Sequence, residues 1–385
     1  MLADTNDQIQ DSEPQQPRQG PLHQRHVDLG AKLVDFAGWL MPIEYEGVLK
    51  EHMYVRESVG IFDVSHMGTV LISGQAASAL ADVAFALDVA AVASGKAAYG
   101  LCLNESGGVV DDLLIYVRSN TEIMVIPNAS NADKVVSALT EVRDSNSEFA
   151  DIEIADVGIE FAILAVQGPT AGRVLAEAGY PTELDYMSFI DIDDVTVARS
   201  GYTGEYGFEL VVPTAQAASV WDALVEAAKS QDGGPVGLGA RDTLRLEMGY
   251  PLHGHELAPD RMALTAPVGW TIGWDKPAFI GREAIVAAKE QGTDRKLVAL
   301  RFTDRGIPRE GMAVVNLSGE EPREVGVVTS GTFSPSLKAG IALALVDTES
   351  VANGDELAVD VRGRQLATER VTLPFVDSNP RVVPA

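Results

Sequence analysis

The sequence predicts a protein of mixed helices and strands with a separate all-β domain at its C-terminal end. The chain has 385 residues, which suggests two or three domains at roughly 150 residues per domain. Most of the chain mixes helical and strand patterns, but residues 296–375 change to evenly spaced short apolar runs. Such runs are typical of a small barrel or sandwich. We therefore place a domain boundary within residues 285–295.

Periodicity and turn residues predict the individual elements. Apolar residues at helical spacing predict helices over 48–62, 76–92 (one or two helices), 132–144, 216–230 and 237–249. Alternating or continuous apolar runs between turn signals predict strands over 67–74, 161–169, 194–204 and 207–213, with three more within 99–130. Residues 31–39 are predicted to form a short apolar strand or a turn.

Charge and composition narrow the possible partners. The 56 acidic and 29 basic residues give a net charge of −27, which disfavours binding to nucleic acid or to an anionic membrane. No apolar run reaches the roughly 20 residues of a membrane span. Residues 1–19 are polar and lack both a secretory and a transit pattern, so we expect a disordered arm and a cytoplasmic protein. An anionic ligand would have to meet a few well-placed arginines.

Generic motifs give little guidance. The sequence has no P-loop and no nucleophile elbow, and GLGARD (237–242) lacks the third glycine of a dinucleotide turn. His253 and His255 lack a second cluster of metal ligands, which favours a turn or a hydrogen-bonded role. The single cysteine, Cys102, lies in an apolar run and is predicted to be a buried structural thiol.

Two adjacent carboxylates, Asp111 and Asp112, interrupt what otherwise reads as a buried strand, GGVVDDLLIY (107–116). Burying an unpartnered charge costs free energy, so each acid needs a partner or a function. Neighbours in a strand point to opposite faces, so we expect the two not to face the same pocket. One acid would accept hydrogen bonds from a loop and the other would face a ligand, and periodicity leaves open which is which.

A second candidate segment is RSGYTGEYGFEL (199–210). Its glycines allow a ligand to approach the backbone around Tyr202. A hairpin turn explains the glycines as well, but it does not explain the carboxylate of Glu209 within an apolar strand. Glu209 is therefore the residue that favours a binding site here.

A third candidate segment is ARDTLRLEMG (240–249), read as a helix. Asp242 and Arg245 are spaced for an intrahelical salt bridge, which is the simplest explanation of this charge pattern. Arg241 lies in the first helical turn, where its guanidinium can instead pair with a ligand carboxylate.

Seven segments of the chain form a recognisable set. They are PLHQRHVDLGAKLVDFAGWLMPIEY, IFDVSHMG, GGVVDDLLIY, VQGP, GYTGEYGFE, GARDTLRLEMGYPLHGHEL and EVGVVTSGTFSPSLKAGIALALV. Taken together, they resemble the aminomethyltransferase family, the T protein of the glycine cleavage system. Each is weakly specific alone, but they occur in family order from about Pro21 to Phe375 and so cover nearly all of the chain.

The resemblance implies an α+β, three-domain, folate-binding fold. Two intertwined α+β domains would occupy residues 20–290, a C-terminal β-barrel 291–376 and a tail 377–385. It also implies a transferase of glycine catabolism and one-carbon metabolism. Family members transfer the one-carbon unit from the aminomethyl-lipoyl H protein to tetrahydrofolate, giving 5,10-methylenetetrahydrofolate, ammonia and dihydrolipoyl H protein. Tetrahydrofolate would be the acceptor substrate, lipoylated H protein the partner, and no metal is expected.

The resemblance also implies roles for particular residues. Asp112 would be the catalytic acid near N10 of the folate, and Asp111 its structural neighbour. A fixed carboxylate suits this position because it stabilises a cationic iminium carbon and handles a proton. Glu209 would bind the pterin N–H groups and Arg241 the glutamate carboxylate of folate. The other implied folate-pocket residues are Met67, Tyr99, Tyr116, Asn128 and Tyr202.

One departure and several alternatives accompany this interpretation. Family members can carry a tyrosine just after the C-terminal PFV, where this chain has Pro380 and Arg381. A dimethylsulfoniopropionate demethylase is the main alternative function, although the TSG-xx-SP-x-L segment favours the T protein.

Other folate-dependent relatives fit less well. The lack of a flavin domain argues against the dimethylglycine or sarcosine oxidising enzymes in which this domain is fused to a flavin domain. The segment WDKPAFIGREAI (274–285) lacks the cysteine of relatives that assist iron–sulfur cluster assembly. A catalytically inactive binding protein would tolerate the loss of Asp112.

Overall fold

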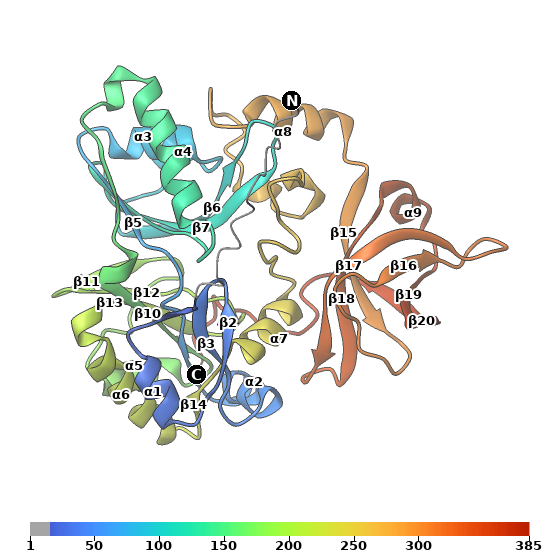
Figure 1. Cartoon of the computed structure of the whole chain (residues 1–385), viewed down its shortest axis with the longest axis horizontal. Helices are drawn as coiled ribbons and strands as arrows, with labels where there is room; N and C mark the ends of the chain where they lie inside the picture. The colour runs from blue at the N-terminus through green and yellow to red at the C-terminus, as the bar shows by residue number, and fades with distance from the viewer. Residues whose placement is uncertain (1–15, 385) are drawn as a thin grey trace, which may run out of the picture.

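The computed structural model of the chain describes residues 16–384, and these form three lobes around a central region (Figure 1). Residues 1–15 of the predicted N-terminal arm lie outside the described residues. Ordered structure starts earlier than expected, because strand β1 (Arg18–Gln19) already pairs in parallel with β3 (Trp39–Glu44). Strand β3 also pairs with β2 (Lys32–Phe36), completing a three-stranded sheet.

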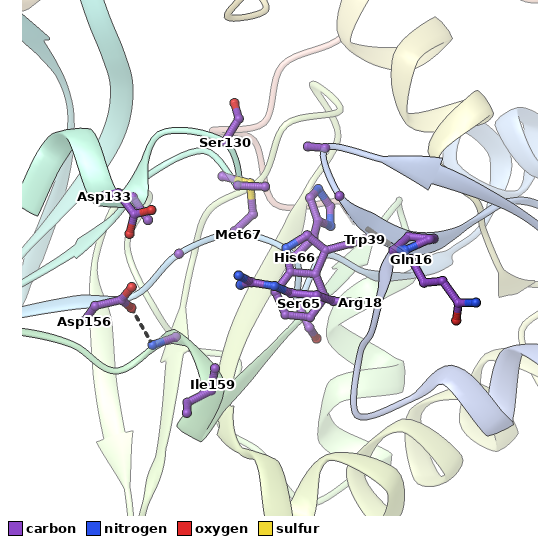
Figure 2. A pocket seen from close by; sticks show the side chains of 17 residues that line it. Gln16, Arg18, Trp39, Ser65, His66, Met67, Ser130, Asp133, Asp156 and Ile159 are labelled. Carbon is purple, nitrogen blue, oxygen red and sulfur yellow. Dashed lines mark hydrogen bonds between the residues drawn. The ribbon is translucent and has the colours of Figure 1, made fainter. Parts of the chain in front are cut away.

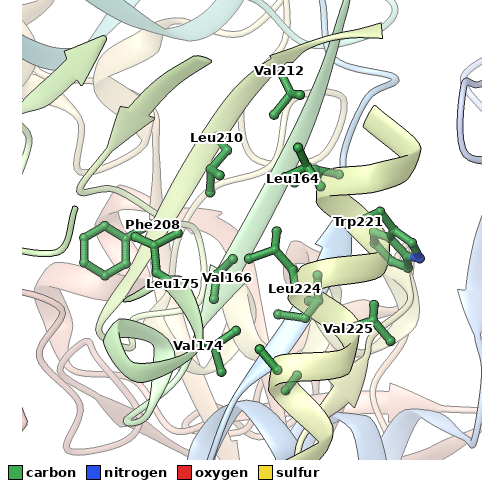
Figure 3. Packing of buried hydrophobic residues seen from close by; sticks show 14 of the residues in the cluster. Leu164, Val166, Val174, Leu175, Phe208, Leu210, Val212, Trp221, Leu224 and Val225 are labelled. Carbon is green, nitrogen blue, oxygen red and sulfur yellow. The ribbon is translucent and has the colours of Figure 1, made fainter. Parts of the chain in front are cut away.

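A six-stranded sheet with the order β11-β12-β13-β10-β4-β14 forms one lobe. Helices cover one of its faces, where Leu164, Phe208 and Trp221 share a buried cluster (Figure 3). Trp221 and Leu224 recur at helical spacing, which explains the helix that covers this face. The elements are β4 Gly60–Asp63, β10 Phe161–Gln167, β11 Phe189–Ile192, β12 Val195–Ala198, β13 Gly207–Pro213, β14 Gly234–Pro235, α1 His23–Asp28, α5 Ala171–Glu177 and α6 Thr214–Lys229.

A five-stranded sheet with the order β6-β7-β8-β5-β9 forms the second lobe. Its outer face packs against two helices through a second cluster that includes Leu80, Ile115 and Leu139. Cys102 is buried in this cluster, as predicted. The elements are β5 Val70–Ser73, β6 Lys96–Leu103, β7 Val109–Ser119, β8 Glu122–Ile126, β9 Glu153–Asp156, α3 Ala77–Ala84 and α4 Ala132–Ser145.

The inner sides of the two sheets share one core. Phe62 of β4 and Ala165 of β10 belong to the same buried cluster as Tyr116 of β7 and Met124 of β8. Two helices, α2 (Val48–Glu57) and α7 (Leu238–Met248), complete this core. The segments predicted from the sequence to bind a ligand therefore surround the junction between the two sheets.

The C-terminal lobe is a closed six-stranded barrel with the order β15-β18-β17-β16-β19-β20. It packs on α7, where Leu246 shares a buried cluster with Ile341 and Leu343 of the barrel. The barrel predicted from the short apolar runs is confirmed. Its elements are β15 Arg295–Phe302, β16 Ala313–Asn316, β17 Arg323–Ser334, β18 Ala339–Asp347, β19 Leu357–Val361, β20 Arg364–Val371 and α9 Thr348–Asn353.

Some element predictions were wrong. The helix expected over 48–62 ends at Glu57, and Gly60–Asp63 is strand β4 in the centre of a sheet. All four residues of β4 are buried, so this segment lacks the alternation of buried and exposed residues that would distinguish a strand from a helix. The strand expected over 194–204 ends at Ala198 and continues as a loop. Helix α8 (Arg282–Gln291) occupies part of the segment 285–295, directly before the first barrel strand.

Among residues 16–384, no helix has the length and apolar character needed to cross a bilayer.

Gly108 holds β7 close to the loop that follows α7. A Cβ atom at Gly108 would lie 1.9 Å from the carbonyl oxygen of Pro259, which also accepts a 2.7 Å hydrogen bond from Asn104 Nδ2. We expect Gly108→Ala to destabilise the protein by about 1–3 kcal/mol in urea unfolding, because backbone must shift to make room. Gly20→Ala is the matched control, since a Cβ there has no atom within 4 Å. Equal unfolding midpoints for the two variants would contradict this account.

Candidate active site

Asp112 lies at the centre of a small hydrogen-bonded group. The hydroxyl of Tyr99, on the neighbouring strand β6, donates to its Oδ2 atom at 2.8 Å. The side-chain amide of Asn128, just after β8, donates to its Oδ1 atom at 3.1 Å and to its backbone carbonyl at 2.9 Å. Asp112 is 9% exposed, so a ligand would meet a carboxylate that is already held in place.

Asp111 is fully buried and binds the loop that follows β8. It accepts hydrogen bonds from the backbone N–H of Asn128 at 2.9 Å, from the Asn128 amide at 2.9 Å and from the Asn131 amide at 2.7 Å. This matches the expectation that one acid of the pair serves a loop. The two acids are nevertheless linked, because the side-chain amide of Asn128 contacts both.

Burial raises the pKa of both acids. The pKa of Asp112 lies above its usual range because burial disfavours the charge, although the Tyr99 hydrogen bond and the charge of nearby His253 act in the opposite direction. Burial and the charge of Asp112 raise the pKa of Asp111 to about 7, against the stabilising hydrogen bonds of the two asparagines. A carboxylate with a raised pKa suits proton transfer near neutral pH.

Tyr202 and Arg241 form a second group. Tyr202 lies in the loop between β12 and β13, and its hydroxyl donates to the carbonyl of Pro251. Its ring stacks on Tyr250 at 5.7 Å, and the guanidinium carbon of Arg241 lies 4.9 Å from its centroid. Asp112 contributes, after burial, to raising the pKa of Tyr202, so the two groups are electrostatic neighbours.

Arg241 carries a positive charge that the surrounding protein leaves partly unmatched. Its Nη1 atom is buried without a hydrogen-bond partner, and no salt bridge to Arg241 is present among residues 16–384. Burial lowers its pKa, while the charge of Glu209 acts against this. By contrast, Arg245 pairs with Asp242 at 2.7 Å, so the predicted intrahelical salt bridge is confirmed.

Glu209 and Tyr116 form the third group. Glu209 is 8% exposed and accepts a 2.6 Å hydrogen bond from the hydroxyl of Ser200. Burial and the charge of Glu209 raise the pKa of Tyr116, which packs at 5.3 Å against Phe189. Met67, in the loop after β4, packs against the same core. All eight predicted site residues thus surround the junction of the two sheets.

Sequence reasoning missed several neighbours of this site. His253 Nδ1 accepts a 3.0 Å hydrogen bond from the side-chain amide of Asn131, and His253 lies close enough to affect Asp112; the sequence indicated only a turn or hydrogen-bonded role for it. Trp270 is 73% exposed and stacks on Tyr99 at 5.8 Å. Neither lies in a periodic pattern that points to the site, because each reaches it from a distant loop.

The C-terminal tail borders the same region. The carbonyl of Pro380 accepts a 2.9 Å hydrogen bond from Arg199, and the guanidinium of Arg381 lies 5.1 Å from the centre of the Tyr186 ring. Burial raises the pKa of Tyr250 to about 12, and the positive charge of Arg381 acts in the opposite direction. Arg381 therefore brings a positive charge to the region of Tyr186 and Tyr250. The described residues contain no cluster of His, Cys, Asp and Glu suited to a metal.

Comparison with known protein families covers both parts of the chain. The GCVT N-terminal domain family matches residues 22–276, and the glycine cleavage T-protein C-terminal barrel domain family matches residues 295–377. This chain belongs to the glycine cleavage T-protein family. The predicted membership, the three-domain fold with its barrel and the aminomethyltransferase class of enzyme are thereby confirmed.

Individual relatives cover nearly the whole chain. An aminomethyltransferase of Mycobacterium avium is 50% identical over 362 residues, covering 93% of this chain and 96% of the relative. One from Parafrankia is 50% identical over 370 residues, covering 94% and 99%. The crystal structure of the glycine cleavage system aminomethyltransferase T from Bartonella henselae has a TM-score of 0.88 at 34% identity, covering 94% of this chain and 99% of that one. These relatives favour the T protein over the demethylase alternative.

Proposed function

We propose that this enzyme transfers the one-carbon unit of an aminomethyl-lipoyl H protein to tetrahydrofolate in the cytoplasm. The observation that carries the proposal is the buried carboxylate of Asp112, held by Tyr99 and Asn128 in a site that also contains Arg241. Arg241 supports an anionic ligand, because a buried guanidinium with an unfilled donor favours a negative partner. The glutamate carboxylates of a folate supply that charge.

Glu209 would bind the pterin, at the other end of the folate. A pterin presents an amino group and ring N–H groups side by side, and a carboxylate accepts such a pair of donors. The hydroxyl of Ser200 already fixes one oxygen of Glu209, so the side chain is oriented before a ligand arrives. The folate would then lie with its pterin at Glu209, its glutamate at Arg241 and N10 near Asp112.

In this reaction one carbon loses its bonds to a nitrogen and a sulfur and gains bonds to two nitrogens of tetrahydrofolate. The carbon leaves the amine nitrogen as ammonia and the lipoyl sulfur as a thiol, while bonds form to N5 and N10 of tetrahydrofolate. The protons released from N5 and N10 balance those taken up by the departing nitrogen and sulfur. Asp112 would stabilise the cationic carbon between these steps and handle the N10 proton. Tyr99 and Asn128 would keep its oxygens in position.

Replacing Arg241 by glutamine should weaken tetrahydrofolate binding about 10- to 100-fold, since a charged hydrogen bond contributes roughly 1.5–3 kcal/mol. The dissociation constant from a fluorescence or calorimetric titration measures this. Arg305→Gln is the control, because Arg305 is exposed and lies in the barrel lobe. Unchanged affinity in Arg241→Gln would remove this residue from the folate site.

A turnover assay tests the proposed function itself. Purified protein is mixed with tetrahydrofolate and aminomethylated H protein, and methylenetetrahydrofolate and ammonia are followed together. We expect the two products to appear in equal amounts. A protein that binds tetrahydrofolate but yields neither product would contradict the proposal, and dimethylsulfoniopropionate would then be the next substrate to test.

A further inference from the structure

The side chain of Asn131 does not cap the helix that it begins. Asn131 directly precedes α4, where an asparagine usually accepts a hydrogen bond from a backbone N–H of the first helical turn. No such bond forms here, and the buried side chain turns toward the candidate active site instead. Its neighbours Ser130 and Ala132 line a cavity of about 300 Å³ (Figure 2), so packing alone does not hold this loop.

Three hydrogen bonds fix the Asn131 amide in one orientation. Its Nδ2 atom donates to Oδ1 of Asp111 at 2.7 Å and to Nδ1 of His253 at 3.0 Å. Its Oδ1 atom accepts from Nζ of Lys134 at 2.8 Å. An amide turned the other way would present its oxygen to a carboxylate and its hydrogens to an ammonium group. The amide therefore keeps this orientation, and His253 is its acceptor.

The partners of His253 determine which of its ring nitrogens carries the proton. Nε2 lies 3.1 Å from the backbone carbonyl of Val109, at the start of β7. A carbonyl oxygen can only accept, so Nε2 carries the hydrogen. Nδ1 receives the N–H of Asn131 and so has a free lone pair. The ring is neutral in this arrangement, because a second proton on Nδ1 would point at the Asn131 hydrogens.

The turn that carries His253 is held from within and from α7. The backbone N–H groups of His255 and Glu256 both donate to the carbonyl of Leu252. The buried carboxylate of Glu256 accepts from the N–H of Leu252 at 3.0 Å and pairs with Arg245 at 3.2 Å. A ring on such a turn can hold its partner in place.

The contacts of His253 reach Asp112 through the neighbouring acid. Oδ1 of Asp111 accepts from the Asn131 amide and also from the Asn128 amide, at 2.9 Å. The same Asn128 amide donates to Oδ1 of Asp112 at 3.1 Å. Displacing Asn131 leaves Asp111 short of one donor and lets the Asn128 amide shift toward it, away from Asp112.

We propose that His253 is a positioning residue for the transfer reaction: its neutral ring holds the Asn131 amide against Asp111 and thereby fixes the carboxylate of Asp112. This inference rests on the proposed function. The second histidine of LHGHEL has a different partner, since Nδ1 of His255 donates to the carbonyl of Thr329 in the barrel at 2.9 Å. His255 therefore provides a matched control in the same turn.

Two replacements separate the two hydrogen bonds of the ring. His253→Asn places an amide oxygen near the position of Nδ1, so this variant can still accept from Asn131 but does not reach Val109. His253→Gln places an amide nitrogen near the position of Nε2, so it can still donate to Val109 but offers Asn131 no acceptor. Both new side chains are uncharged, so the pair differs in one contact to the site.

We expect His253→Gln to lower kcat about 3- to 10-fold, the effect of losing one neutral hydrogen bond. His253→Asn should restore kcat to within about twofold of wild type, and His255→Gln should match it. The dissociation constant of tetrahydrofolate should stay within about twofold in all three variants, because Glu209 and Arg241 are unchanged. Equal losses of kcat in His253→Gln and His253→Asn, or no loss in His253→Gln, would overturn the inference.

The acid limb of the kcat–pH profile provides a second measurement. Burial and the charge of Asp112 raise the pKa of Asp111 to about 7, and the hydrogen bond from Asn131 opposes this rise. Without that bond the pKa should rise further, so the acid limb of His253→Gln should lie at higher pH than that of His253→Asn. Coincident limbs would contradict the role of His253. Both variants keep the ionisable groups around this network, which are Asp112, Tyr99, Cys102 and Lys134.

Crystal structures of the two variants test the same contact without turnover. The Asn131 amide should move away from Asp111 in His253→Gln and stay in place in His253→Asn. An unmoved amide in His253→Gln would overturn the inference, whether or not the wild-type enzyme is active. A displaced amide together with an inactive wild type would support the contact and refute the proposed reaction alone.

Discussion

Asp112→Asn should lower kcat about 100- to 10,000-fold, the range that a positioned acid–base group contributes. Asparagine has the shape of aspartate and can still accept the Tyr99 hydrogen bond, so the variant should fold. It cannot, however, balance the charge of an iminium carbon or take up the N10 proton. We expect tetrahydrofolate affinity to change much less than kcat, because Glu209 and Arg241 remain. A kcat within tenfold of wild type would contradict the catalytic role.

The neighbouring acid provides the control. Asp111→Asn introduces an amide where three N–H donors now point at a carboxylate. Its main effect should therefore be a lower free energy of unfolding, measured in urea, with a smaller loss of kcat in the molecules that remain folded. If Asp111→Asn loses more activity than Asp112→Asn while it remains folded, the roles of the two acids must be exchanged.

The second large effect is expected at Glu247, on α7. Glu247 is fully buried and joins three parts of the chain. It pairs with Arg56 of α2 at 2.9 Å, lies 3.2 Å from His52 and accepts a 2.9 Å hydrogen bond from Ser336, which follows barrel strand β17. Glu247→Gln should destabilise the protein by about 1.5–3 kcal/mol, because it removes a buried charged acceptor from Arg56 and Ser336 and leaves Arg56 paired with Glu205 alone.

Urea unfolding followed at several wavelengths measures this loss. Glu226→Gln on α6 is the control: its salt bridge to Lys229 is largely exposed, so the change should cost less than about 1 kcal/mol. Similar unfolding free energies for the two variants would show that the Glu247 network does not stabilise the fold.

The change of the unfolding free energy with pH provides a second test of Glu247. Burial alone would raise its pKa, but the hydrogen bond and charge of His52 and the charge of Arg56 lower it to about 2. Because the folded pKa lies below the unfolded value of about 4.3, this stabilisation is present above that value and is lost as the pH falls toward 2. Glu247→Gln should lack this part of the acid dependence.

The sequence predicted what depends on local pattern. The barrel followed from its short apolar runs, and the Asp242–Arg245 pair followed from helical spacing. The cost of burying a charge predicted that one acid of the pair would bind a loop, and the family resemblance implied that this acid is Asp111. That Asn128 would contact both acids did not follow, because β8 ends at Ile126 and its loop then crosses the end of β7, a geometry set by tertiary packing.

The parts that escaped prediction depend on contacts between distant segments. Glu247 looks like an ordinary helical acid in the sequence, since its partners come from α2 and from the barrel. The pocket shown in Figure 2 likewise combines loops that no motif connects. The residues that we propose for the folate pocket came from the family resemblance, and the structure adds their arrangement around the junction of the two sheets.

The most direct test of the central claim is a crystal structure of the protein with a stable reduced folate, 5-methyltetrahydrofolate. The account predicts the pterin on Glu209, the glutamate on Arg241 and N10 within roughly 2.6–3.2 Å of an Asp112 oxygen or one water away. A folate bound elsewhere, or one that leaves Asp112 facing bulk solvent, would contradict the assignment of this site.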